Sequence, residues 1–482
     1  MMNANERPRL LQAIAIVDHG TLAIDPVVER SIAPGPDVSR APGLGPAALV
    51  PNKPPGATIP AVLAYGLVRL GGSPELSGLT LWSRLLGAWL PTLVLAGFLA
   101  RRLGDDAHAR AAVGIVVLAT PLAAYAHVLF GHSLAALCVC VGTTWILDGL
   151  EDRDRGRALR GGIVAALAVT VEYGAAVAAI PLGVALVLAW SRGARAPVIS
   201  AAIGAVLPML ALGAYHAHVF GSPWSTGYHT VTDAGFAEIH DRGLLGLTWP
   251  VLGDVVEDLI SPHGGLFYWA PVALFVPLAW RLELPPRERR FVRVNLGVFA
   301  AMVLMTLCLA QAGGWRVGPR YLVAGLPMLA PALAGLLRAN DRREGWLAAL
   351  GGVVIASTVL NALAANLFPH LVPGGNPLRD QLVPLLQLGL GPYTVLEGYR
   401  GGFAGTVWLP MIVAVAIVML ALGRIVEPTR RGRVLVTSLV VAAALLVPAW
   451  SVPPADDAET TLSTIVEIWE PGGQRTPRDT LL

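Results

Sequence analysis

Long apolar runs, separated by short polar turns, fill most of this chain. A helix needs about 20 apolar residues to cross the hydrocarbon core of a bilayer. Runs of that order predict about 12 transmembrane helices, at 79–99, 111–130, 132–150, 161–174, 175–190, 197–220, 264–280, 292–311, 320–337, 345–364, 406–423 and 433–450. The apolar run 57–70 is shorter and follows two prolines, which favours a helix lying at the membrane interface. We therefore expect an all-α integral membrane protein.

Composition supports this class and excludes others. Hydrophobic residues make up 55% of the chain and charged residues 14%, whereas soluble domains average about 25% charged residues. No stretch gathers the basic side chains of a nucleic-acid-binding face, so nucleic acid is not expected as a partner. The three cysteines lie within apolar runs and are interpreted as small packed hydrophobic residues.

Arginine is concentrated at every second turn of the chain. The positive-inside rule places such loops in the cytoplasm. Six short loops follow it, at 101–110, 153–160, 192–195, 281–293, 338–343 and 424–433. The twelve spans give this alternation without a conflict. We interpret the chain as a multi-pass protein of the bacterial cytoplasmic (inner) membrane, surrounded by membrane lipids.

The opposite face carries the longer segments. We expect an extracytoplasmic loop with interfacial helices at 1–78, a transmembrane domain at 79–450 with outer loops 221–263 and 366–405, and a polar outer tail at 451–482. Loops held on a rigid scaffold commonly carry function, so the chemistry is expected outside the cytoplasm. A chain that starts outside without a signal peptide also leads us to expect a missing first span before Met1.

Three cations outside the cytoplasm are candidates for binding a phosphate. Lys53, in PNKPPG (51–56), is the only lysine of the chain, and an ammonium is a compact point charge that suits an anion. Arg316 and Arg320, in GWRVGPRYL (314–322), lie where the positive-inside rule predicts few arginines, and Arg320 opens a helix, whose N-terminus favours anions. The alternatives are a chance surface lysine and an interfacial anchor beside Trp315 and Tyr321.

Two polar residues stand at the outer ends of apolar runs. Glu172 lies in VEYG, where an ionisable group is costly and usually faces a polar cavity. A carboxylate that reaches to the interface explains it equally well. His132 follows the turn at Gly131, where it suits either a helix cap or a substrate hydroxyl.

The outer loops supply further candidates. Any acid of the first loop could act as the general base for an acceptor hydroxyl or amine. These acids are Glu6, Asp18, Asp25, Glu29 and Asp37. Tyr228 in FGSPWSTGYH (220–229) and His263 in SPHGGLFYWAP (261–271) are polar candidates in aromatic segments. Such segments form either a platform for a sugar or an aromatic belt at the membrane surface.

The order of these motifs resembles the GT-C glycosyltransferases, polytopic enzymes that use polyprenyl-phosphate sugars, and in particular the aminoarabinose transferases and protein O-mannosyltransferases. The resemblance covers most of the chain and rests on NERPRLLQAIAIVDHGTLAID (5–25), PNKPPG (51–56), ARRLG (100–104), EYG (172–174), FGSP (220–223), GLFYWAP (265–271), GPRYL (318–322) and NPL (376–378). Each motif is loose by itself, and their order is more specific.

The resemblance implies a site and a reaction. Asn5-Glu6 stands where the family often has Asp-Glu, so Glu6, or Asp37 in its place, is expected as the catalytic acid. Lys53 matches the family's lysine of Lys-Pro-Pro, which meets the lipid phosphate. The implied reaction moves a sugar, with inversion, from a polyprenyl-phosphate donor to an acceptor lipid, glycan or protein. No metal ligands are assigned, and a divalent cation is left open as a cofactor.

Two other functions fit a polytopic membrane protein. A transporter or lipid flippase is the main alternative, although such proteins often carry internal repeats and none is evident here. A non-catalytic scaffold would require neither Lys53 nor Arg320.

Overall fold

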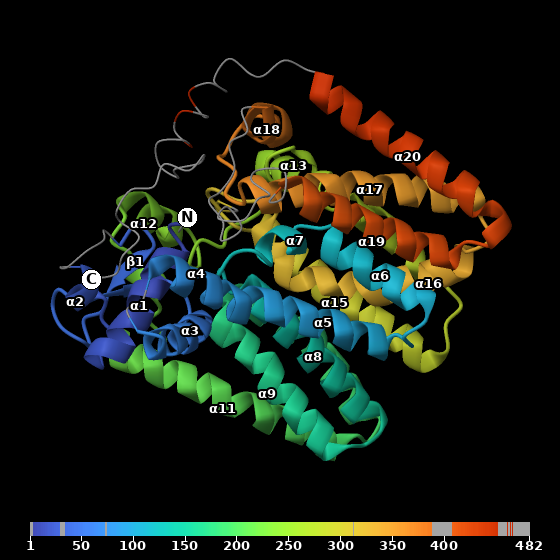
Figure 1. The fold of residues 1–482 in the computed structure, drawn as a ribbon. Coiled ribbons are helices and arrows are strands. Elements are labelled where there is room, and N and C mark those ends of the chain that lie inside the picture. The colour runs from blue at the N-terminus through green and yellow to red at the C-terminus, as the bar shows by residue number, and fades with distance from the viewer. Residues whose placement is uncertain are drawn as a thin grey trace.

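The computed structural model describes residues 3–28, 34–72, 75–311, 313–387 and 407–451, together with 460, 463 and 465. Within this part of the chain nearly all regular structure is helical (Figure 1). The expected fold class, an all-helical polytopic membrane protein, is thereby confirmed. Glu29, most of the tail 451–482 and part of the loop 366–405 lie outside the described residues.

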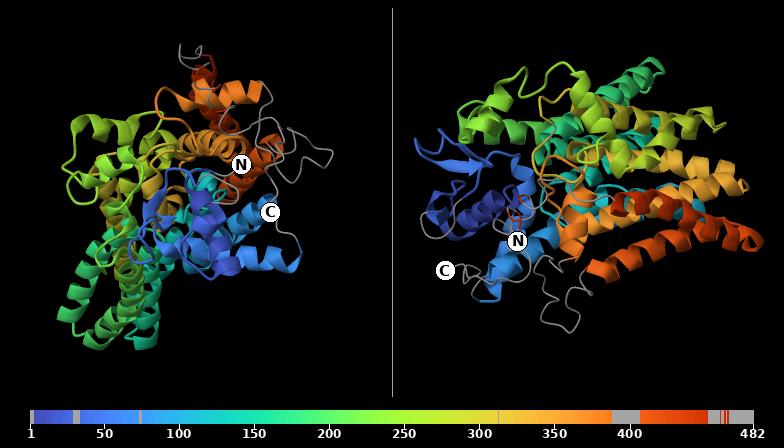
Figure 2. Two further views of the ribbon diagram at one scale, coloured as in Figure 1. Left: turned by 90° about the vertical axis from the view of Figure 1, so that its left-hand side faces the viewer. Right: turned by 90° about the horizontal axis from the view of Figure 1, so that it is seen from above.

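The first outer segment forms a small layer at one end of the helical bundle (Figures 1 and 2). Its elements are α1 (Glu6–His19), α2 (Asp25–Val28), β1 (Val38–Arg40), β2 (Leu49–Pro51), η1 (Pro55–Thr58) and α3 (Ile59–Leu70). The two strands pair antiparallel, with Val38 opposite Pro51. This hairpin was not expected, because strands of three residues around a Gly- and Pro-rich turn show no alternating pattern.

The interfacial helix expected at 57–70 is present as η1 and α3. Ile59, Leu63, Leu67 and Leu70 are each more than half exposed. Residues spaced by three or four share one side of a helix. An apolar side without a protein neighbour is the arrangement that an interfacial helix needs.

Helices are present at all twelve places where spans were expected. The described residues form seven helices that are long and apolar enough to cross a membrane: Leu76–Arg102 (α4, Leu76–Arg84; η2, Leu85–Trp89; α5, Leu90–Arg102), α8 (His132–Glu151), Tyr173–Ser191 (η3, Tyr173–Ala178; α10, Ala179–Ser191), α11 (Arg195–Phe220), α15 (Pro286–Leu307), Arg320–Asn340 (η6, Arg320–Leu329; α16, Ala330–Asn340) and α17 (Glu344–Leu367). Shorter apolar helices include α6 (Ala107–Leu118), η5 (Pro271–Arg281) and α19 (Leu409–Ile425). The number of spans therefore stays a prediction.

The remaining helices include α9 (Arg155–Val171) and α20 (Pro428–Ser451), which lie at two of the places where spans were expected, and short helices that connect the spans or lie in the loops. The short helices are α7 (Leu122–Tyr125), η4 (Gly227–His229), α12 (Ala234–Asp241), α13 (Leu252–Ile260), α14 (Leu266–Trp269), η7 (Leu378–Leu382) and α18 (Val383–Gln387).

The run expected as one span at 111–130 is divided. Helix α6 ends at Leu118, and the short α7 follows Pro121. Proline lacks the N–H that would continue the helical ladder, and the Thr120 hydroxyl instead accepts from the Leu122 N–H at 3.3 Å. Helix α7 ends in turn at Tyr125, and the buried backbone of Leu129 beyond it binds the side chains of Arg9 and Glu6.

Close packing through glycines fixes the position of α9. Its Gly162 faces α11, where a Cβ would lie 2.0 Å from the Ala201 carbonyl oxygen. Gly142 of α8 faces α9 in the same way, with a Cβ 2.5 Å from the Ala165 nitrogen. Small residues let membrane helices approach this closely. Helices α8 and α11 therefore hold α9 between them, and this fixes the place of Glu172 at its end.

Candidate active site

Lys53 lies beside Asp37 where the hairpin ends. The Lys53 Nζ is 3.7 Å from the Asp37 Oδ1, and the two side chains are only 10% and 12% exposed. The Lys53 Nζ also lies 4.9 Å from the centre of the Tyr228 ring, close enough for a cation–π interaction. The hairpin positions the pair, because the Asn52 N–H donates to the Asp37 carbonyl at 3.1 Å.

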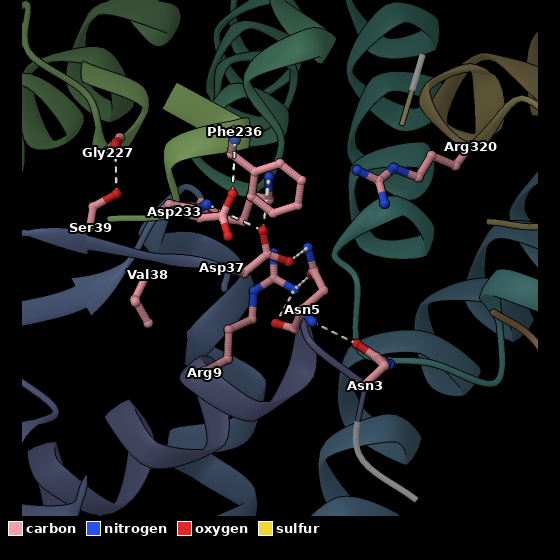
Figure 3. A network of polar contacts seen from close by, with 12 residues as sticks. Asn3, Asn5, Arg9, Asp37, Val38, Ser39, Gly227, Asp233, Phe236 and Arg320 are labelled. Carbon is pink, nitrogen blue, oxygen red and sulfur yellow. Dashed lines mark hydrogen bonds and ion pairs between the residues drawn. The ribbon is translucent and has the colours of Figure 1, made fainter. Parts of the chain in front are cut away.

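Two amides fix the Asp37 carboxylate. Asn52 Nδ2 donates to Oδ1 at 3.2 Å, and Asn5 Nδ2 donates to Oδ2 at 3.3 Å (Figure 3). The Asn5 amide is oriented in turn by the buried Arg9, whose Nη1 donates to the Asn5 Oδ1 and, at 2.9 Å, to the Leu129 carbonyl. Arginine can only donate, so the Asn5 NH₂ group must point towards Asp37.

Glu6 is held in a different way. It is fully buried, and Arg84 binds both of its oxygens, from Nε at 2.8 Å and from Nη2 at 2.7 Å. The Leu129 N–H donates to it at 2.6 Å. Burial raises the pKa of the Glu6 carboxyl, but the charge and hydrogen bonds of Arg84 outweigh this effect and leave the pKa below its usual value. A carboxylate so strongly bound is a weak proton acceptor.

Arg320 extends from the start of η6 towards the side on which Asn5 and Asp37 lie (Figure 3). Its Nη2 donates to the Tyr321 hydroxyl at 2.9 Å. Its Nε is buried and has no hydrogen-bond partner among the described residues. Space for the guanidinium depends on Gly313, which has φ +112° and where a Cβ would lie 2.8 Å from that Nε.

Glu172 and His132 form a buried pair at the outer ends of α9 and α8. The His132 Nδ1 is 3.2 Å from the Glu172 Oε2, and both side chains are buried. The Tyr125 ring packs edge-on against His132 at 5.0 Å between centres. Glu172 is also near enough to Lys53 to interact electrostatically with it. Glu172 therefore belongs to the same cluster and does not reach out to the interface.

Tyr228 comes to the cluster from the second outer loop. Its ring stacks on His240 at 4.2 Å between centres. The loop is fastened to the hairpin, because the Ser39 hydroxyl donates to the Gly227 carbonyl at 2.5 Å. A Cβ on Gly227 would lie 2.6 Å from the Asn52 carbonyl oxygen. Burial raises the pKa of the Tyr228 hydroxyl well above its usual value, so it stays protonated and able to donate.

The structure separates the two outer arginines. Arg316 pairs with Asp258 of α13 at 3.1 Å, and both side chains are 4% exposed. His263 lies in this second group, with its Nδ1 3.4 Å from the Glu257 Oε1. Burial raises the pKa of Asp258 to about 6 despite Arg316, and burial lowers the pKa of His263 to about 4. Of the three expected phosphate-binding cations, Lys53 and Arg320 share one cluster. Arg316 is paired with Asp258 instead, although its Nε and Nη1 also have no hydrogen-bond partner among the described residues and it lies near enough to Arg320 to interact with it electrostatically.

Several important residues were not singled out from the sequence. Arg84 stands within an apolar stretch and Arg9 at the start of one, and this is the signal that was available for them. Asn5, Asn52 and Tyr321 lie in the motifs described above, but the sequence assigned them no role in the site. Two other acids of the first loop serve structural bonds: Asp18 accepts from the Tyr65 hydroxyl at 2.5 Å, and Asp25 accepts from the Leu49 N–H at 2.9 Å. No group of three His, Cys, Asp or Glu side chains able to hold a metal ion occurs among the described residues.

Comparison with known proteins gives structural neighbours only. No family model and no curated protein matches the chain. Two structures of ArnT from Cupriavidus metallidurans, in the apo state and bound to undecaprenyl phosphate, match at 17% and 16% identity and a TM-score of 0.49 each. They cover 93% of this chain, which covers 71% and 72% of theirs. Arabinosyltransferase EmbB from Mycobacterium smegmatis matches at 14% identity and a TM-score of 0.43, over 97% of this chain and 41% of its own.

Proposed function

We propose that this protein is a membrane glycosyltransferase that moves a sugar from a polyprenyl-phosphate donor to an acceptor on the extracytoplasmic face. The observation that carries the proposal is the position of the only lysine of the chain. Lys53 is nearly buried against Asp37 and Tyr228, in a cluster that also includes Arg320. Such a cluster combines cations for a leaving phosphate with a carboxylate for an incoming nucleophile. The donor class follows from the resemblance of the sequence.

In this proposal Lys53 and Arg320 bind the phosphate of the donor. The buried Arg320 Nε without a partner provides a donor that a phosphate oxygen satisfies. Buried cations aimed at a leaving group stabilise the charge that develops on it, and such electrostatic stabilisation is commonly a large contribution to catalysis. Tyr228, which remains protonated, is a further donor for phosphate or sugar oxygens.

Asp37 is the preferred base. The Asp37 Oδ1 accepts a hydrogen bond from Asn52, and the Asp37 Oδ2 accepts one from Asn5. Oδ2 has a second lone pair, which is available to accept a proton. Asp37 receives the proton of the acceptor hydroxyl or amine as that atom bonds to the anomeric carbon. The bond from this carbon to the phosphate oxygen breaks at the same time, and its electron pair leaves with the polyprenyl phosphate. A single displacement inverts the anomeric configuration. Glu6, bound by Arg84, holds the first outer segment in place.

The setting follows the sequence interpretation. The bacterial cytoplasmic membrane supplies the lipids, the layer formed by 1–78 covers the outer ends of the spans, and the acceptor is a lipid, glycan or protein. Lys53 and Arg320 provide positive charge for the phosphate. A divalent cation stays a prediction without assigned ligands.

The test is transfer of radiolabelled sugar from polyprenyl-phosphate donors by the full chain in proteoliposomes. Lys53→Ala and Arg320→Ala should abolish most of the transfer. Arg69→Ala is the matched control, because Arg69 is an exposed cation of the same outer segment that pairs with Asp18, and it should leave transfer unchanged. If the wild type transfers no sugar from any donor but moves labelled lipid across the bilayer, the protein is a flippase and the proposal is wrong.

A further inference from the structure

Helix α13 (Leu252–Ile260) lies across the ends of the spanning helices. It is seen nearly end-on in Figure 1, where α17 and α19 run along the plane of the view. The chain reaches α13 within the second outer loop, after α11 and before α15. Its axis therefore runs roughly parallel to the membrane plane, at the level of the outer membrane surface.

The side chains of α13 divide into three sectors at about 3.6 residues per turn. Leu252, Val256 and Ile260 form one sector and are 78%, 49% and 62% exposed. Asp258 turns into the protein, where it is buried against Arg316. Asp254 and Glu257 form the third sector and are exposed. The helix therefore has a protein side, an apolar open side and a charged open side.

The segment that leads into α13 is attached to the end of a spanning helix. The segment before α13 is fastened to the outer end of α15, because the Thr248 N–H donates to the Cys308 carbonyl at 2.6 Å and Leu247 pairs with Leu309. Leu304, one turn inward on α15, is 60% exposed. An exposed leucine on a membrane-spanning helix faces lipid. Trp249, which is 90% exposed, is a residue type enriched at the membrane–water interface.

We propose that α13 is seated in the outer leaflet, with Leu252, Val256 and Ile260 among the lipid chains and with Asp254 and Glu257 in water. The partner of this face is the lipid surface itself. The attachment to the end of α15, one turn from the exposed Leu304, favours lipid over a second protein, because it places the apolar stripe near the level at which the hydrocarbon region of the bilayer ends. On its protein side, α13 holds Arg316 through Asp258, and Arg316 stands four residues before Arg320. The lipid-seated helix thus braces the segment that presents Arg320.

A depth measurement tests this proposal. Single cysteines are placed at 252, 254, 256, 257 and 260 in a chain whose three native cysteines are replaced by serine, and a nitroxide label is attached in proteoliposomes of phosphatidylethanolamine and phosphatidylglycerol. Leu304→Cys serves as the lipid reference. We expect labels at 252, 256 and 260 to match that reference in preferring collisions with oxygen, and labels at 254 and 257 to prefer a water-soluble nickel chelate.

The opposing outcomes are distinct. If the labels at all five positions collide preferentially with the nickel chelate, the helix lies in water and the proposal is wrong. Labels at 252, 256 and 260 shielded from both reagents would show a protein neighbour, which also overturns it. The native chain provides a second measurement that needs no substitution. A phospholipid with a photoactivated carbene near its headgroup should label peptides containing 247–260. If α15 peptides are labelled in the same sample and peptides containing 247–260 are not, the proposal is wrong.

Discussion

The two faces of the membrane domain use charged residues differently. On the side predicted to be cytoplasmic, Arg102 and Arg287 both bind Asp148, at 2.8 Å and 3.2 Å, and Arg287 also binds Asp152 at 2.9 Å. On the outer side, the Lys53 Nζ stands 3.7 Å from its carboxylate, and the Arg320 Nε has no hydrogen-bond partner among the described residues. The first network joins α5, α8 and α15 through close ion pairs, although its Arg102 Nε also has no hydrogen-bond partner among the described residues. The second network holds its lysine and carboxylate farther apart, and in the proposed function this leaves Lys53 available to a ligand.

The largest effect is expected when the central carboxylate of each network is replaced by an amide. Asp37→Asn should reduce sugar transfer by roughly 10²–10⁴-fold, the range lost with a general base, while the protein still folds. Asp148→Asn, in the cytoplasmic network, should reduce thermal stability and leave the rate per folded molecule near that of wild type. Single-turnover transfer and thermal unfolding, measured side by side, check both. Equal loss of transfer in the two variants would contradict the distinction.

The next effect concerns the arginines. Arg320→Lys keeps the charge but loses the planar guanidinium, which directs several N–H groups at once. We expect transfer to fall roughly 10²-fold, as it does when one preorganised donor is removed. Arg102→Lys should change transfer little. The fall should appear in kcat rather than in KM, because the interaction strengthens as the phosphate leaves. A change confined to KM would show that Arg320 only binds the donor.

A smaller effect is expected from Asn5→Asp, which places a second carboxylate about where Asn5 Nδ2 lies, 3.3 Å from the Asp37 Oδ2. Two carboxylates this close share a proton, so the base is occupied by a proton at higher pH than in wild type. The acid limb of the pH–rate profile should therefore move to higher pH. Asn5→Ala, which removes the donor without adding charge, should move the limb less. An unchanged limb in both variants would exclude Asp37 as the base.

The smallest effect concerns the second ion pair, Asp258 and Arg316. Because the folded pKa of Asp258, about 6, lies above the ordinary value of 3.8, the folded state binds the proton more tightly. Its contribution to stability is full below pH 4 and is lost as the pH rises to about 6. The melting temperature of wild type, minus that of Asp258→Asn, should therefore fall by a few degrees across this window. His263 titrates in the same window and is present in both proteins, so most of its own contribution cancels in the difference. A flat or rising difference would contradict the raised pKa.

The sequence by itself determined the class of protein and the face that carries the candidate site. Apolar length and arginine alternation are properties of local segments, and the bilayer imposes them on each segment independently. For the same reason Lys53 and Glu172 could be singled out: a lysine in a chain of arginines and an acid in an apolar run are visible without knowing their neighbours.

Only the tertiary structure decided which charges meet. Glu6 and Asp37 are both acids of one loop, but Arg84 reaches Glu6 from 78 residues away and leaves Asp37 to Lys53. Arg316 and Arg320 are four residues apart, yet α13 takes the first and the cluster receives the second. Which charged residues pair depends on contacts between segments that are distant in the sequence, and on the burial that removes water from those contacts. A local stretch of sequence contains neither piece of information.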